Sequence, residues 1–281
     1  MAGGMSDALT TIALNETAYA KINLALHVRA RREDGYHELE TLFAFVDGGD
    51  ALSAVAAEKD SLAITGEFAP LLAGEEGNLV LDALGLIARD TGWAVALDKA
   101  LPVAAGLGGG SADVGAVFRM ARRAGVLPEN WAELAARLGA DVPACVESVA
   151  MVGRGTGTEL FPAPDDLAGC PVLLVNPRVP LPTGPVFKAW DRVDRGAMPE
   201  GSAREIALYG RNDLEAPAIS ICPEVADVLA VLGRTGAWLS RMSGSGATCF
   251  ALFDDVAGRD AAAAVVAAEQ PGWWQLAGLL R

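Results

Sequence analysis

A run of glycines that leads straight into an apolar, helix-like segment constrains this chain most. Residues 101–125 read LPVAAGLGGGSADVGAVFRMARRAG. Glycines let successive backbone N–H groups converge on one point, and a helix after Ser111 would add unpaired donors and the positive end of its dipole. Apolar residues from Val114 to Ala121 recur at helical spacing. The segment predicts either a phosphate-binding loop or a tight loop that only feeds a buried helix.

The loop lacks the signatures of the common nucleotide-binding motifs. A Walker A loop needs a Gly-Lys pair, which occurs nowhere in the chain. A dinucleotide fingerprint needs GxGxxG, and Gly106, Gly108 and Gly110 have a different spacing. The HRD and DFG motifs of protein kinases are also missing from the sequence.

A second glycine loop, MSGSGATCF, spans residues 242–250. It offers the hydroxyls of Ser243, Ser245 and Thr248 among flexible glycines. Such a segment is more often a plain turn between two strands. Two glycine loops in one chain nevertheless favour a ligand that is held from two sides.

The charge balance limits the class of partner. The formal net charge is −14 and the sequence pI is ≈ 4.6, whereas nucleic acids and anionic membranes need clustered Lys and Arg. We therefore expect neither nucleic acid nor a membrane as partner, although a small phosphorylated ligand needs only local donors.

The chain shows no signal for export or for metal binding. The first sixteen residues lack a basic start before an apolar core, and no run approaches the ~18 apolar residues of a membrane span. The four cysteines form no CxxC pair, which predicts buried thiols rather than a zinc site or disulfides. We expect a cytoplasmic protein with no dedicated metal cluster.

The segment ETAYAKINLALHV alternates in a way typical of a strand. Lys21, Asn23, Ala25 and His27 fall on one face, so a half-buried strand with polar groups on its open face is expected. The Asp-Gly turn that follows and the segment LETLFAFVD predict a hairpin.

Helices are expected at residues 77–92, with Asn78 at the N-cap and Gly92 near the end, and at residues 128–139. In ADVPACV, a tight turn is expected because Pro143 forbids a continuing helix.

The pattern as a whole predicts an α+β protein of two domains. A Pro-, Asp- and Gly-rich stretch at residues 160–171 marks the junction, which gives domains at 1–168 and 169–281. Residues 1–16 are expected to be a disordered extension. Trp273 and Trp274 are assigned to terminal-helix packing.

Several segments carry a resemblance to a known family. PVAAGLGGGSA resembles the phosphate motif of the GHMP kinases, which phosphorylate small molecules such as galactose, homoserine and mevalonate. AYAKINLALHVRARREDGYHELETLF, GADVPACV and MSGSGATCFALF resemble further segments of one branch of this family, in the same order and spacing. GNLV, PTGPVFKAWD and NDLE fill the intervals, so the resemblance covers the chain after residue 16.

The resemblance implies the two-domain GHMP kinase fold: an N-terminal domain with the glycine loop, a ferredoxin-like C-terminal domain, and an active site between them. It also implies ATP-dependent phosphorylation of the 2-hydroxyl of a cytidine-diphosphate methylerythritol, a step of non-mevalonate isoprenoid biosynthesis. Mg²⁺ is expected to arrive with ATP.

Two residues match the catalytic positions of the family. Asp141 would accept the proton of the substrate hydroxyl, either as a full base or mainly as a positioning group. Lys21 would keep that carboxylate ionised and balance charge in the transition state. Without the resemblance, Asp141 would be assigned as a turn residue before Pro143, and Lys21 as a solvated strand lysine.

The resemblance assigns the remaining residues to two ligands. His37 would read the pyrimidine edge and Phe187 would stack on the base, whereas His27 is expected to be structural. Asn212, Asp213 and the glycines near Ser245 would support the loops. The substrate-binding set is Asn23, Tyr36, His37, Thr183 and Phe187, and the ATP-binding set is Asn78, Lys99, Pro102, Gly106, Leu107, Gly108, Gly109, Gly110 and Ser111.

The chain departs from the family pattern at three positions. Ala112 stands where a second serine is common, and Ala104 and Ala105 replace a glycine pair. Two alternatives stay open: another GHMP small-molecule kinase, and a nucleotide-binding regulator without catalysis. Either a monomer or a homodimer is compatible with the sequence.

Overall fold

The fold is given by a computed structural model that describes residues 13–73 and 77–281. Most of the predicted extension, residues 1–12, lies outside the described residues. Leu14–Glu16 belong to the first strand, so the expectation of disorder is wrong for these three residues. Within the described ranges, none of the helices has both the length and the apolar character needed to cross a bilayer.

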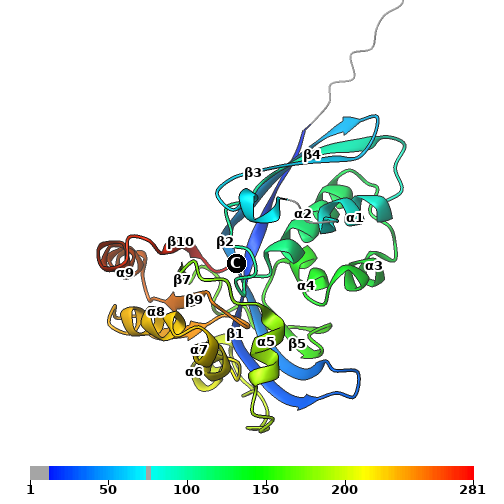
Figure 1. The fold of residues 1–281 in the computed structure, drawn as a ribbon. Helices are drawn as coiled ribbons and strands as arrows, with labels where there is room; N and C mark the ends of the chain where they lie inside the picture. The colour runs from blue at the N-terminus through cyan, green and yellow to red at the C-terminus, as the bar shows by residue number, and fades with distance from the viewer. Residues whose placement is uncertain (1–12, 74–76) are drawn as a thin grey trace, which may run out of the picture.

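The first half of the chain builds a six-stranded sheet in the order β3-β4-β2-β5-β6, with β1 paired to β2 (Figure 1). Helix α2 packs on β1 and α4, and its buried stripe joins the N-terminal core. The strands are β1 (Leu14–Arg31), β2 (His37–Ala57), β3 (Ser61–Thr65), β4 (Gly92–Asp98), β5 (Met151–Gly155) and β6 (Glu159–Pro162), and the helices are η1 (Ala69–Leu72), α1 (Leu79–Leu86), α2 (Gly109–Arg123), α3 (Trp131–Leu138) and α4 (Val142–Glu147).

The second half builds a four-stranded antiparallel sheet in the order β10-β7-β9-β8, with α8 and α9 beside it (Figure 1). The predicted two-domain α+β architecture is confirmed. The boundary at residue 168 stays a prediction; it falls between the two sheets. The elements are β7 (Pro171–Asn176), α5 (Thr183–Ala189), α6 (Ala203–Tyr209), α7 (Glu215–Ile221), α8 (Glu224–Leu232), β8 (Leu239–Met242), β9 (Cys249–Leu252), α9 (Val256–Glu269) and β10 (Trp274–Leu279).

The long β1–β2 hairpin joins the two halves. In β1, the Leu26 N–H donates to Arg211 O at 2.8 Å, and the Val28 N–H donates to Asp213 Oδ2 at 2.8 Å. Leu26 and Val28 belong to the core of the second half, whereas Ala18 belongs to the core of the first. The predicted Asp-Gly turn closes this hairpin, with Gly35 at φ 89°.

The expectation that β1 carries its polar groups on an open face is wrong in two respects. Lys21, Asn23 and His27 are all buried. The first glycine loop and Asp141 cover Lys21, whereas the second half of the chain covers Asn23 and His27. The register with β2 also shifts between Asn23 and Ala25, so Leu24 is a bulge and alternation breaks there. Leu26 consequently shares the face of Lys21 and Asn23, and His27 does not.

Three other local expectations are corrected. Gly92 starts β4 rather than ending α1, which stops at Leu86. Pro143 lies in the first turn of α4, where its missing N–H would have no helical partner in any case. Trp274 starts β10, opposite Asn176 of β7, rather than packing a terminal helix.

Candidate active site

The two glycine loops hydrogen-bond to each other. The Ser243 hydroxyl donates to Gly106 O at 2.8 Å and accepts from the Asn23 N–H at 3.2 Å. The Thr248 N–H donates to Ala105 O at 3.1 Å. Strand β1, the first loop and the β8–β9 loop are therefore fixed to one another, although they are far apart in sequence.

A cavity of about 930 Å³ opens beside this junction, a size typical of small-molecule sites. Gly106 and Ser245 both line the cavity, so the two loops face the same space. That they hold one ligand from two sides stays a prediction. The predicted site residues on its wall are Lys21, Asn23, Tyr36, His37, Gly106, Gly108, Gly109, Gly110, Ser111, Asp141, Thr183 and Phe187.

An ion pair between Lys21 and Asp141 lies at the centre of the wall. The Lys21 Nζ atom is 3.0 Å from Asp141 Oδ2, and the lysine side chain is 5% exposed against 34% for the aspartate. Asp141 occupies the N-cap position of α4, yet its side chain accepts no capping hydrogen bond. The carboxylate therefore faces the cavity and does not cap the start of the helix.

A chain of hydrogen bonds fixes the lysine. Its Nζ atom donates to Asn23 Oδ1 at 3.0 Å, and Asn23 Nδ2 donates to Thr41 Oγ1 at 2.8 Å. The Thr41 hydroxyl donates in turn to Ala25 O at 2.7 Å. The Lys21 ammonium is thereby held to a single position beside the carboxylate.

The first glycine loop needs glycine at two positions. A Cβ atom on Gly106 (φ +76°) would lie 2.3 Å from Ser243 O, so a side chain would separate the two loops. A Cβ atom on Gly108 (φ +61°) would lie 3.1 Å from Lys21 Cε, so the backbone passes close to the ion pair. Gly108 is the N-cap of α2 in the left-handed region, which glycine adopts at little cost.

Helix α2 begins at Gly109, earlier than expected, so Gly109, Gly110 and Ser111 form its first turn. The N–H groups of a first helical turn have no intrahelical acceptor, and the helix dipole adds positive potential there. All three residues line the cavity. This end of the cavity can therefore hold phosphate through the backbone.

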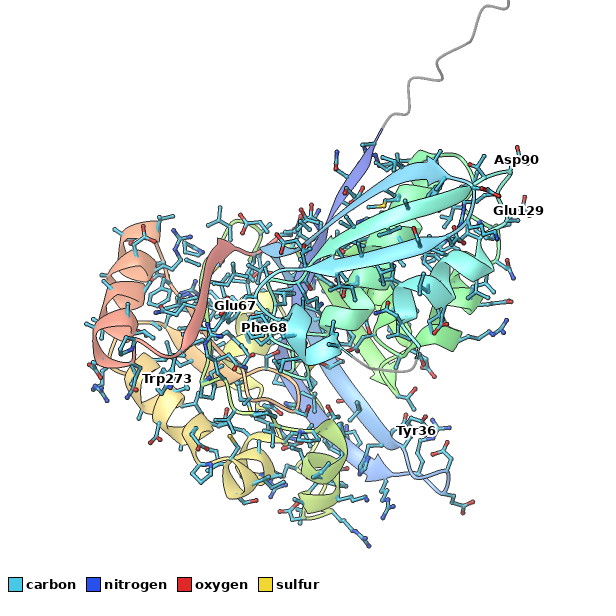
Figure 2. The ribbon with its side chains drawn as sticks, turned by 45° about the horizontal axis from the view of Figure 1, so that its top comes forward. Tyr36, Glu67, Phe68, Asp90, Glu129 and Trp273 are labelled. Carbon is cyan, nitrogen blue, oxygen red and sulfur yellow. The ribbon has the colours of Figure 1, made fainter. Side chains whose placement is uncertain are left out.

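An aromatic group forms the other end. The His37 ring lies 4.8 Å from the Phe187 ring and 5.7 Å, edge-on, from Trp190. Burial, with a smaller contribution from the Arg31 guanidinium, lowers the pKa of His37, which keeps the ring neutral at physiological pH. Tyr36, 66% exposed, lies at the hairpin tip (Figure 2).

Some wall residues were missed by sequence reasoning. Trp190 follows Phe187 by three residues, a helical spacing that could have paired them. Leu26 and Thr41 reach the wall because of the bulge at Leu24 and the β1–β2 register, neither of which the alternation pattern indicates.

Four predicted ATP contacts do not line the cavity. Lys99 is buried, and its Nζ atom lies between Asp50 and Asp113; its contact with ATP stays a prediction. Pro102 and Leu107 are also buried and shape the loop from behind. The remaining residue is Asn78, whose side chain accepts from the Val80 N–H and caps α1; its contact with ATP stays a prediction.

His27 is structural, as expected. Its Nε2 atom accepts from the Arg211 N–H at 3.1 Å, so its Nδ1–H donates to Gly196 O at 3.2 Å. Burial, with Arg211, lowers the pKa of this histidine. In the neighbouring segment Asn212 Nδ2 donates to the carbonyls of Met242 and Gly244, both at 2.8 Å, and so supports the second glycine loop.

The fold and the site together define a small-molecule kinase of the GHMP class. The family model for the GHMP kinases N terminal domain matches residues 78–148, and that for the GHMP kinases C terminal matches residues 196–271. A crystal structure of a homoserine kinase from Cytophaga hutchinsonii superposes with a TM-score of 0.66 over 99% of this chain and 98% of its own, at 15% identity, which shows the fold.

Closer relatives narrow the class. The chain is 66% identical over 96% of its length to 94% of the 4-diphosphocytidyl-2-C-methyl-D-erythritol kinase of Novosphingobium aromaticivorans. It is also 60% identical to the 4-diphosphocytidyl-2-C-methyl-D-erythritol kinase of Erythrobacter litoralis, over 95% of this chain and 100% of that relative. A crystal structure titled 4-(cytidine 5'-diphospho)-2C-methyl-D-erythritol kinase matches with a TM-score of 0.77 at 32% identity, over 95% of this chain and 99% of its own. The chain belongs to the 4-diphosphocytidyl-2-C-methyl-D-erythritol kinase family of GHMP kinases.

Proposed function

We propose that this protein transfers the γ-phosphate of ATP to the 2-hydroxyl of 4-diphosphocytidyl-2-C-methyl-D-erythritol. The observation that carries the proposal is the Lys21–Asp141 pair at 3.0 Å, beside the first turn of α2 and in the same cavity as an aromatic group. The names of relatives at 60% and 66% identity support the same reaction.

The chemistry follows from the pair. The substrate hydroxyl donates to Asp141 Oδ2, and its oxygen attacks the γ-phosphorus while the bond to the β-phosphate oxygen breaks. The proton passes to the carboxylate, and ADP leaves. Lys21 offsets the negative charge that develops on the transferred phosphoryl group, between the attacking oxygen and the leaving oxygen. The backbone N–H groups at Gly109 and Gly110 hold the phosphates of ATP.

Mg²⁺ fits this site as a companion of ATP. Among the described residues no group of three His, Cys, Asp or Glu side chains could hold a metal, and Asp141 is the single carboxylate on the described wall. Mg²⁺ usually binds through phosphates and one or two carboxylates, and it would neutralise phosphate charge during transfer.

The aromatic end would hold the cytidine. We propose that the base stacks on Phe187 and that neutral His37 hydrogen-bonds its edge, while Tyr36 and Thr183 complete this subsite. A cytoplasmic location, and a monomer or homodimer, stay predictions.

Phe187→Ala is expected to raise the KM for the cytidine substrate about tenfold or more, because stacking on a base contributes ~1–3 kcal/mol. The KM for ATP should change little, since the phosphates bind at the other end. Steady-state ADP release with each substrate varied in turn measures both constants. The matched control is Phe161→Ala, an exposed Phe outside the cavity; an unchanged substrate KM in Phe187→Ala would refute the stacking assignment.

ATP-dependent ADP release with 4-diphosphocytidyl-2-C-methyl-D-erythritol, beside mevalonate and homoserine, tests the reaction itself. Turnover with the cytidine substrate alone is expected. Turnover with another alcohol would favour a different GHMP kinase activity. ATP binding without turnover on any alcohol would favour the non-catalytic regulator.

A further inference from the structure

The cavity wall is positively charged although the protein is acidic. Its charged side chains are Asp141 and four cations, beside the neutral His37 and Tyr36, in a chain with a formal net charge of −14. One cation, Lys21, is paired with Asp141. The catalytic step therefore uses one of the four, and the other three are Arg31, Lys188 and Arg192.

These three cations have no carboxylate partner within 4.0 Å among the residues that the structure describes. Five acidic side chains nearby are already paired, and Glu33, two residues after Arg31, lies more than 4.0 Å from each of the three cations. Asp194 and Glu40 pair with Arg29, Asp34 and Glu38 pair with Arg32, and Asp191 pairs with Arg195. The local arrangement thus leaves positive charge facing the cavity.

All three cations surround the aromatic end rather than the glycine loop. Arg31 lies directly opposite His37 in the β1–β2 register, and its charge contributes to the lowered pKa of that histidine. Lys188 follows Phe187 on α5, and Arg192 lies two residues beyond Trp190. In Figure 1, α5 lies beside the hairpin that carries Arg31.

Arg192 also adopts an unfavourable backbone conformation. Its φ is 65°, in the left-handed region that costs a side-chain-bearing residue roughly 1–2 kcal/mol. Strain of this kind at a cavity wall is a sign of a functional constraint. Glycine would avoid the cost, but it would remove a guanidinium from the wall.

We propose that Arg31, Lys188 and Arg192 bind the diphosphate of the cytidine-diphosphate substrate, an inference that rests on the proposed function. A base on Phe187 places its phosphates within the same part of the cavity as these side chains. Guanidinium groups match phosphate oxygens with two parallel hydrogen bonds, and such charged bonds are among the strong ones. The phosphates of ATP have separate donors at the start of α2.

Calorimetric titration of CDP, cytidine and ATP into the full-length protein tests the proposal without turnover. For Arg31→Gln/Arg192→Asn we expect about a tenfold loss of CDP affinity, at up to ~1 kcal/mol per exposed charge contact and ~1.4 kcal/mol per tenfold. Cytidine and ATP affinities should stay within about twofold. The matched control Lys59→Gln/Arg137→Gln removes the same charge from exposed positions outside the cavity that form no ion pair within residues 13–73 and 77–281.

The outcomes separate this inference from the proposed function. Equal loss of CDP and cytidine affinity would assign the arginines to the base and overturn the inference. Loss of ATP affinity alone would assign them to the nucleotide and also overturn it. An unchanged CDP affinity, with cytidine still bound, would overturn it while the proposed substrate stands. A wild-type protein that binds neither CDP nor cytidine would overturn both.

Arg192→Gly gives a second readout that a merely structural residue would not produce. Removing the strained side chain is expected to raise the thermal midpoint or leave it unchanged, while CDP affinity falls and cytidine affinity does not. A variant that melts lower and binds CDP as the wild type does would show that Arg192 serves the fold instead, and would overturn its part in the inference.

Discussion

Asp141→Asn is expected to lower kcat by about 10²–10⁴-fold, the range for loss of a general base. The amide has the shape of the carboxylate and keeps the N-cap position of α4. It accepts no proton, and it places a neutral group beside the Lys21 ammonium where a charge stood at 3.0 Å. ATP binds at the first turn of α2, so its affinity should be nearly intact.

Steady-state ADP release at saturating ATP and cytidine substrate measures kcat, and calorimetry measures ATP binding. Asp165→Asn is the matched control, because Asp165 is exposed and lies outside the cavity. Full turnover in Asp141→Asn would remove Asp141 from the chemistry. A large loss of ATP affinity would mean that the substitution disturbs the glycine loop instead.

Local sequence predicted much of the site because its parts are local. The Asp-Gly turn, the glycine loop and the cap of α1 at Asn78 each depend on a few neighbouring residues, and the structure confirms them. The resemblance added Lys21 and Asp141, which a pattern of alternation alone would have left as a solvated lysine and a turn residue.

The features of the site that the sequence did not predict depend on pairing between segments that are distant in the chain. Alternation placed His27 with Lys21, but the bulge at Leu24 reverses the faces, and a bulge leaves no clear mark in residue type. Lys99 matched a ligand position, yet its partners Asp50 and Asp113 are 49 and 14 residues away in the chain. Only the register of β2 on β4 brings Asp50 beneath the loop.

The buried triad of Lys99, Asp50 and Asp113 supports the phosphate loop. The Lys99 Nζ atom donates to Asp50 Oδ2 at 2.5 Å and to Asp113 Oδ2 at 2.7 Å. Asp50 Oδ1 accepts the N–H groups of Ala100 at 2.6 Å and Leu101 at 2.7 Å, which lead into the loop. A Cβ atom on Gly109 would lie 3.3 Å from Lys99 Nζ, so the triad lies directly under the start of α2.

The triad contains two carboxyl groups, Asp50 and Asp113, and one ammonium group, Lys99. The hydrogen bonds indicate which carboxyl group takes a proton. Asp50 accepts three hydrogen bonds, whereas Asp113 Oδ1 has no hydrogen-bond partner among the described residues. Burial raises the pKa of Asp113 to about 7, against the pull of Lys99. Near neutral pH, Asp113 is therefore partly protonated.

Lys99→Met is expected to lower the free energy of unfolding by ~3–5 kcal/mol at pH 7, because it leaves buried carboxylates without a counter-charge. The lost tie between the loop and α2 should also weaken ATP binding. Asp113→Asn is the matched control: it neutralises an acid that is already partly protonated at pH 7, so it should cost far less. Urea denaturation and ATP calorimetry measure both effects, and equal losses in the two variants would contradict the assigned protonation.

The pH dependence gives the sharper test. The pKa of Asp113 is about 7 in the folded protein and near the ordinary value of 3.8 when unfolded, so the folded state binds the extra proton. Its stabilisation is full below pH 3.8 and is lost as pH rises through 7. Relative to wild type, Asp113→Asn should therefore gain stability on the order of 3 kcal/mol between pH 5 and pH 8. Parallel stability curves for the two proteins would show that the proton resides elsewhere in the triad.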